Sequence, residues 1–279
     1  MAPRLGSSSA RLAAKLYDNA PQELRRNAKR SIKRAMKPYG TEFMGSMLID
    51  ASLELERRAS IPGARRINFL DAGAGAGMAI KNAEVISPKV SAWGMAPHSP
   101  SSKEWVKKAR KARPGYEPPP RKKWIRGFFE TSFVPNFFHV IQVHFSIMHA
   151  LNQSLALENL LNSLRNGGVL IFPRIEFMDY ANIRKEVVVP EVIFKEHAKA
   201  GENRKRELEK KYPALGLKRI FAELRKQGFR VPQIQRFRDG TYRKYFYPEF
   251  LRVERTSGGK ANLSRFYEHP SINRFPLTG

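Results

Sequence analysis

One stretch of the chain constrains its fold more than any other: Ile67-Asn-Phe-Leu-Asp-Ala-Gly-Ala-Gly-Ala-Gly77. Its apolar half has the length of a buried β-strand, and helix-forming residues resume directly after the last glycine. The pattern therefore predicts a strand, a tight turn and a helix. Glycine permits positive φ and lets a ligand approach the backbone closely, while the first turn of a helix offers N–H donors. Such a turn can hold a nucleotide-like cofactor.

The charge of the chain is its second unusual property. The 279 residues include 51 Lys and Arg against 25 Asp and Glu, a formal net charge of +26. Such an excess is typical of proteins that bind a polyanion, above all nucleic acid, although a lineage with generally basic proteins would produce it too. The chain has no cysteine. This excludes disulfides, thiolate nucleophiles and cysteine-ligated metal sites, and we expect no metal.

The sequence contains no apolar run of the ~18 residues that a membrane span requires. The first 17 residues hold Arg4, Arg11 and Lys15 and no acid. We interpret them as part of a basic extension, with a mitochondrial transit peptide as the alternative. The expected compartment is accordingly the cytoplasm, or else the mitochondrial matrix. Nothing in the sequence indicates the oligomeric state.

Three regions follow from the pattern of residues. Residues 1–64 predict a basic helical extension, with one helix that starts near Pro21 and a second that runs from Thr41 to about Ala59. Residues 65–255 alternate between strand-like and helix-like runs, which predicts a parallel, doubly wound α/β sheet. Residues 256–279 predict an irregular tail.

Within the central region, Asn166-Gly167-Gly168 is expected to end a helix by C-cap geometry. The region closes with a helix and a β-hairpin that turns at Asp239-Gly240. Directly before that terminal helix, a charge-rich segment (181–212) is also expected to be helical. The expected strands are 67–70, 90–94, 124–129, 139–145, 169–172, 229–237 and 242–254, and the expected helices are 78–86, 103–112, 155–164 and 214–227.

This order of elements resembles class I S-adenosylmethionine-dependent methyltransferases over residues 65–255. The resemblance rests on the Asp71–Gly77 turn, on segments 140–149 and 157–168, and on the terminal helix and hairpin. Turns that bind NAD place their third glycine three residues after the second, where this chain has Met78. The resemblance implies a seven-stranded, mostly parallel Rossmann-like sheet of strand order 3-2-1-4-5-7-6, with the last strand antiparallel.

The resemblance also implies the cofactor S-adenosylmethionine, with its carboxypropyl group against the backbone of the glycines and its ammonium group at Asp71. The implied cofactor-binding residues are Asp71, Ala72, Gly73, Ala74, Gly75, Gly77, Met95, Phe128 and Phe129.

The chain departs from the family pattern in three places. Where the family ends strand two with an acid that binds the ribose, this chain has Gly94-Met95-Ala96. Phe128 stands where an acid often reads the adenine, and His139 opens the fourth strand in place of an aspartate. Loss of a bidentate carboxylate contact costs on the order of 1–3 kcal/mol of binding free energy. Weak or absent binding of S-adenosylmethionine is therefore the alternative to a functional cofactor site.

His144 is the candidate catalytic residue, because it lies at the carboxyl end of strand four, where open α/β sheets bind ligands. It could act as a general base near neutral pH, or it could be a hydrogen-bonded packing residue. Three functions stay open. The first is a methyltransferase that acts on RNA or a ribonucleoprotein, and the second is a degenerate, non-catalytic methyltransferase-like domain that serves as an RNA-binding, assembly or structural factor. The third is a small-molecule methyltransferase in a basic proteome.

The basic segment Lys103–Arg126 is the candidate nucleic-acid surface, together with the N-terminal helix and the C-terminal hairpin. Ten Lys and Arg residues stand in this segment beside Trp105, Tyr116 and Trp124. Cations interleaved with aromatic rings suit phosphate contacts combined with stacking on unpaired bases. A solvated charged face with core aromatics is the alternative interpretation.

Overall fold

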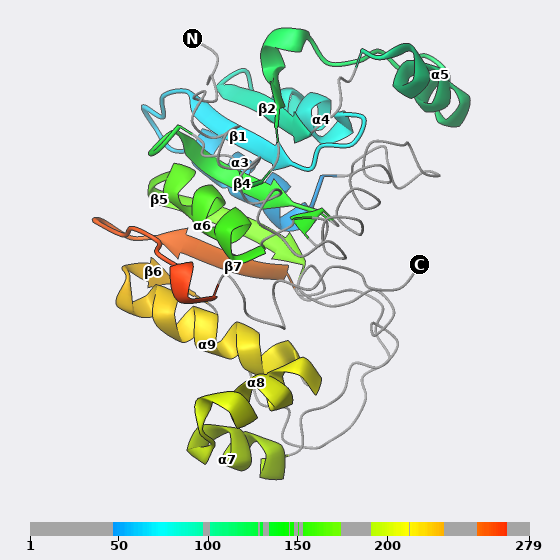
Figure 1. Ribbon diagram of the computed structural model, residues 1–279. Coiled ribbons are helices and arrows are strands. Elements are labelled where there is room, and N and C mark those ends of the chain that lie inside the picture. Colours follow the sequence, from blue (N-terminus) through cyan, green and yellow to red (C-terminus); the bar gives the residue numbers. More distant parts are fainter. Residues whose placement is uncertain are drawn as a thin grey trace.

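The computed structural model describes residues 47–96, 101–127, 129–130, 134–144, 146–147, 150, 153–173, 191–211, 213–231 and 250–266. The described strands form one seven-stranded sheet of order β3-β2-β1-β4-β5-β7-β6. Neighbouring strands from β3 to β5 are parallel, and β7 is antiparallel to both β5 and β6. The predicted α/β sheet and its order are thus confirmed (Figure 1). The strands are β1 Ile67–Ala72, β2 Val90–Ala96, β3 Trp124–Arg126, β4 Phe138–Val143, β5 Leu164–Pro173, β6 Phe229–Arg230 and β7 Phe250–Arg255.

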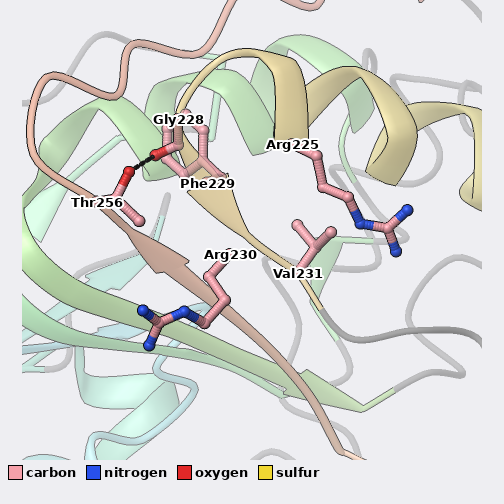
Figure 2. A pocket seen from close by; sticks show the side chains of 6 residues that line it. All are labelled: Arg225, Gly228, Phe229, Arg230, Val231 and Thr256. Atoms are coloured by element: carbon pink, nitrogen blue, oxygen red, sulfur yellow. Dashed lines mark hydrogen bonds between the residues drawn. The ribbon is translucent and has the colours of Figure 1, made fainter.

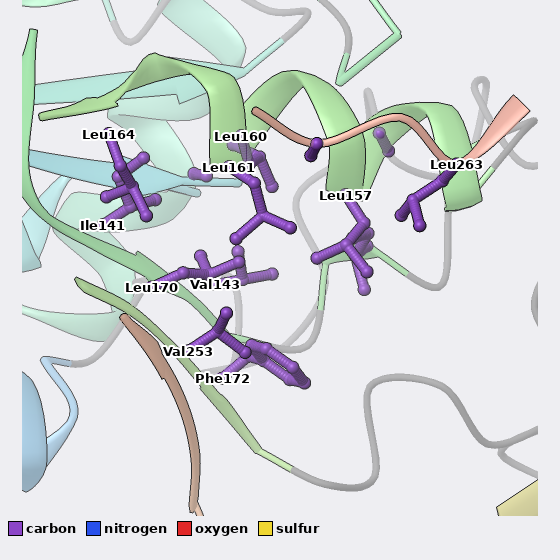
Figure 3. Packing of buried hydrophobic residues seen from close by; sticks show 14 of the residues in the cluster. Ile141, Val143, Leu157, Leu160, Leu161, Leu164, Leu170, Phe172, Val253 and Leu263 are labelled. Carbon is purple, nitrogen blue, oxygen red and sulfur yellow. The ribbon is translucent and has the colours of Figure 1, made fainter. Parts of the chain in front are cut away.

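Helices lie on both faces of the sheet because both faces are apolar. One cluster of buried residues joins β1, β4 and β5 to α6 and α9, and Figure 3 shows Leu157, Leu160 and Leu161 of α6 against Val143 and Leu170. A second cluster on the opposite face joins the sheet to α3 and α4. The described helices are α3 Ile49–Ala59, α4 Met78–Ile86, α5 Lys103–Ala112, α6 Gln153–Ser163, α7 Glu191–Lys199, α8 Glu202–Lys211 and α9 Pro213–Lys226, with short 3-10 turns η2 Arg121–Lys123 and η6 Ser264–Phe266.

Two segments outside the expected central region contribute to its core. Leu48, the N-cap of α3, and Ala51 and Leu55 within α3 are at most 4% exposed and pack in the cluster with β1 and β4. At the other end of the chain, Leu263 and Phe266 are buried in the cluster that contains α6. The predicted helix near Pro21 and the turn of the C-terminal hairpin lie outside the described residues. The base of that hairpin is present as the antiparallel pair β6 and β7.

The Asn-Gly-Gly sequence does not end a helix, contrary to the prediction. The helix α6 ends at Ser163, and β5 starts at the next residue. Leu164 pairs with Phe138 but Val169 pairs with Val140, so the residues between them bulge out of the ladder. Gly167 has a φ of 72°. Gly167 therefore supplies the positive φ of a bulge in β5. A helix C-cap requires the same backbone conformation.

None of the described helices is both long enough and apolar enough to cross a membrane.

Candidate functional site

The glycine turn (residues 73–77) has the predicted conformation. β1 ends directly before it, and α4 begins directly after it. Gly73, Gly75 and Gly77 have φ angles of 89°, 49° and 80°. These angles lie in the left-handed region, which glycine adopts without steric strain. The carboxyl ends of β1, β2 and β4 meet here, where open α/β sheets bind their ligands.

Protein side chains fill the space next to Gly73. A Cβ built on this residue would overlap the Cβ and Oγ of Ser146 and would lie 3.4 Å from Cζ of Phe129. Ser146 is 8% exposed, and its hydroxyl donates a hydrogen bond of 2.8 Å to the carbonyl of Ala72. The absence of a side chain at Gly73 is thus explained by contact within the protein.

The far end of the turn is covered by the loop that follows α5. A Cβ on Gly77 would lie 2.7 Å from Cγ of Pro119. The Tyr116 hydroxyl donates a hydrogen bond of 2.6 Å to the Ala76 carbonyl, and this side chain is 4% exposed. Burial raises the pKa of Tyr116 to about 12. Tyr116 and Pro119 therefore fix the start of α4 against the basic segment.

Backbone amides of the turn are engaged within the protein. The N–H groups of Gly73 and Ala74 both donate to the carbonyl of Met95, each at 2.9 Å. The N–H of Gly77 donates to the carbonyl of Ala74 at 2.6 Å. Met95 thus lies beside the glycine turn, while its role in cofactor binding stays a prediction. Its side chain is 1% exposed and belongs to the core instead of facing a ligand.

The end of β2 is closed as well. A Cβ on Gly94 would lie 2.5 Å from Cδ1 of Ile80, 2.8 Å from Cβ of Ala74 and 2.9 Å from Trp124. A side chain at this position has no room, and Met95 and Ala96 of the same strand are buried. The ribose-binding acid that the family carries at the end of this strand has no counterpart among residues 94–96.

Asp71 has a position and an environment that suit a cationic ligand. It is 2% exposed, and its Oδ1 accepts a hydrogen bond of 2.9 Å from Nε2 of Gln142. Oε1 of Gln142 in turn accepts one of 3.0 Å from the Leu48 N–H at the start of α3. Oδ2 of Asp71 is buried without a hydrogen-bond partner. Burial raises the pKa of Asp71 to about 7, against the opposing effect of the hydrogen bond from Gln142.

The structure places the predicted residues His144, Phe128 and Phe129 differently. His144 lies directly after β4 and is half-buried, and its role as a base remains a prediction. Phe129 reaches the glycine turn, whereas Phe128 lies outside the described residues. Sequence reasoning missed Gln142, Ser146 and Tyr116. The pairing of β1 with β4 places Gln142 beside Asp71, and only the fold reveals it.

Replacing Gly73 by alanine is expected to lower the free energy of unfolding by about 2–4 kcal/mol, because the new Cβ adds overlap with Ser146 to the strain of a positive φ. Gly63 is the matched control, since its φ is +71° and nothing lies within 4 Å of its Cβ position. Gly63→Ala is expected to cost only about 1–2 kcal/mol. Urea denaturation measures both values, and equal losses would contradict the packing against Ser146.

A shallow hollow lies far from this site along the sheet, between α9 and the edge strand β6. Figure 2 shows Phe229 and Val231 beside it, with Arg225 and Arg230 directed away from each other. The Thr256 hydroxyl closes one end by donating to the carbonyl of Gly228. With its two guanidinium groups divergent, the hollow does not assemble a charged site.

The described residues around the glycine turn fit S-adenosylmethionine only in part. The side chains of Ser146 and Pro119 stand where a Cβ on Gly73 or Gly77 would lie. The carbonyl of Met95 accepts hydrogen bonds from two amides of the turn, which are then not available to a ligand. The unpartnered oxygen of Asp71, by contrast, would suit the ammonium group of this cofactor. Among the described residues, no group of His, Asp and Glu could hold a metal ion.

No protein-family model matches the chain, and no curated protein does. Among solved structures it is similar to the cyclase SpnF, at 13% identity and TM-score 0.35, over 55% of this chain and 60% of that one. It is similar to magnesium protoporphyrin IX methyltransferase of Synechocystis with bound SAM, at 12% identity and TM-score 0.35, over 90% and 92%. A Haloferax volcanii methyltransferase in complex with the activator Trm112 has 14% identity and TM-score 0.38, over 74% and 88%. The chain spans about three fifths of the cyclase.

Proposed function

We propose that this chain, which has the strand order of the class I methyltransferase fold, is a non-catalytic member of that fold that binds RNA or a ribonucleoprotein. One observation carries the proposal: at the end of β2, where the family has its ribose-binding acid, Gly94 leaves no room for a side chain and Met95 and Ala96 are buried. The glycine turn then serves to connect β1 to α4. The net charge of +26 supplies the attraction for a polyanion.

Titration with S-adenosylmethionine and S-adenosylhomocysteine tests the first half of the proposal. We expect no heat by calorimetry and no thermal shift at 1 mM ligand. A ligand with a Kd of about 10 µM would stabilise the folded chain by roughly 2.7 kcal/mol at that concentration, which is easily detected. A saturable signal with either compound would overturn the non-catalytic assignment. S-adenosylhomocysteine matters here because it binds without turnover.

A methyltransferase that acts on RNA is the second candidate, and the unpartnered Oδ2 of Asp71 favours it. A cationic ligand group beside this oxygen would offset the cost of its burial. Because burial raises the pKa of Asp71 to about 7, binding of such a ligand would tighten as the pH rises from 6 to 8. His144 would then be the candidate base. A positive titration with that pH dependence is the result that selects this function.

A further inference from the structure

Most cations of the basic segment are exposed, and those of α5 and η2 lie close together. On α5, Lys103, Lys107 and Lys111 are exposed and follow one another at spacings of four, the helical repeat that keeps side chains on one face. Nε of Arg121 in η2 lies 3.4 Å from Oγ of Ser101 and donates to it, which joins η2 to the start of this helix. Figure 1 shows α5 set apart from the sheet. The other exposed cations of the segment are Lys108, Arg110, Arg113, Arg121, Lys122 and Arg126.

The opposite side of α5 is held rigidly. Val106 and Ala109 pack with Tyr116 against Ala76 and Met78 at the start of α4. Since these contacts lie on the inner side of the helix, its outer lysines project from fixed backbone positions. The ten residues of α5 form a row of about 15 Å, given a rise of ~1.5 Å per residue. The spacing of these lysines along the row is therefore set by the fold.

Two aromatic residues of this segment face the protein. The Tyr116 ring is 4% exposed and its hydroxyl is bonded to Ala76. The Trp124 ring lies against Gly94 and packs with the buried cluster of α3 and α4. The Tyr116 ring cannot stack on a nucleic-acid base without leaving its place in the fold, and the Trp124 ring is partly covered by the protein. These contacts favour the alternative interpretation of the two aromatics as core residues. The side chain of Trp105 lies outside the described residues.

From these contacts we infer that the basic segment binds the phosphate backbone of duplex RNA in preference to unpaired bases. The inference rests on the proposed function and names its partner more closely. A nucleic-acid duplex carries two phosphate strands and so presents about twice the phosphate density of one strand along its axis. A row of cations gains from that density, whereas single-strand recognition relies on the stacking of bases on aromatic rings.

Fluorescence anisotropy with the full chain tests the preference. The probes are a 20-base-pair RNA duplex and one of its strands, each titrated from 50 to 200 mM salt. We expect at least tenfold tighter binding of the duplex. Lys107→Gln/Lys111→Gln is expected to weaken duplex binding and to reduce the salt slope by about 2, one per lost phosphate contact. Lys199→Gln/Arg206→Gln, with the same charge change on exposed positions of α7 and α8, is the control and is expected to leave the slope unchanged.

The outcomes separate the inference from the function on which it rests. Equal or tighter binding of the single strand would overturn the duplex preference and leave RNA binding standing. A large loss of affinity in Trp105→Leu would overturn it too, because it would show stacking on that ring. Binding of neither probe at 50 mM salt would overturn the proposed RNA-binding function itself.

Discussion

Replacing Glu54 by glutamine is expected to lower the free energy of unfolding by about 2–4 kcal/mol at pH 7, because it breaks a buried charge cluster. The Glu54 side chain is 2% exposed. Its carboxylate accepts hydrogen bonds from Arg57 at 2.7 Å, from Arg58 at 2.6 Å and from Arg252 at 2.8 Å. Arg58 also donates to the carbonyl of Gly167 in the bulge of β5. The cluster thus ties α3 to β5 and β7.

Acid has a matching effect on the wild-type chain. Burial raises the pKa of Glu54, but hydrogen bonds from Arg57 and Arg252 and the charge of Arg58 outweigh it and hold the pKa at about 2. A carboxylate with a pKa below its unfolded value of 4.5 contributes stability that is present above pH 4.5. That contribution is lost as the pH falls toward 2. The difference between wild type and Glu54→Gln should therefore shrink over this range.

Urea denaturation at pH 7, 4 and 2.5 measures both effects. Glu56→Gln is the control, because Glu56 stands on the same helix but is exposed, and its carboxylate accepts a hydrogen bond of 3.5 Å from the Ser52 hydroxyl. Its expected cost is below about 0.5 kcal/mol. Similar losses for the two variants at pH 7 would show that the cluster does not stabilise the fold.

The strands and helices of the fold could be predicted from local patterns in the sequence. Apolar runs of strand length, helical runs between them and the glycines at 73–77 predict the parallel sheet, and the resemblance adds its strand order. Those signals are short-range, because each depends on residues within one element. The error at Asn166-Gly167-Gly168 has the same origin. Positive φ serves a C-cap or a bulge equally well, and only the pairing of β4 with β5 distinguishes them.

The site could not be predicted in the same way, because its character depends on contacts between distant segments. Ser146 closes the space at Gly73 from 73 residues away, and Pro119 closes it at Gly77 from the loop after α5. A glycine turn with such neighbours and one without them have the same local sequence. The absence of an acid at residues 94–96 is a local signal, and it predicts weak or absent cofactor binding.

Replacing Asp71 by asparagine is expected to stabilise the chain at pH 8 by as much as about 4 kcal/mol, since one pKa unit corresponds to 1.36 kcal/mol. The pKa of Asp71 is raised by burial from 3.8 to about 7. Between these values the unfolded chain releases the proton while the folded chain retains it. Wild-type stability therefore falls as the pH rises from 4 to 7 and is constant above. Asparagine keeps an oxygen for the hydrogen bond from Gln142 and has no charge to bury.

Urea denaturation of wild type and Asp71→Asn from pH 4 to pH 8 measures the effect, with Glu117→Gln as the control because that side chain is 81% exposed. Parallel pH profiles for wild type and Asp71→Asn would contradict a buried, unpartnered carboxylate. The variant also separates the two candidate functions. In a non-catalytic protein, Asp71→Asn should gain stability and bind RNA as before. In a methyltransferase, the same change would remove the group that pairs with the ammonium of the cofactor, so the gain in stability would come with loss of S-adenosylmethionine binding.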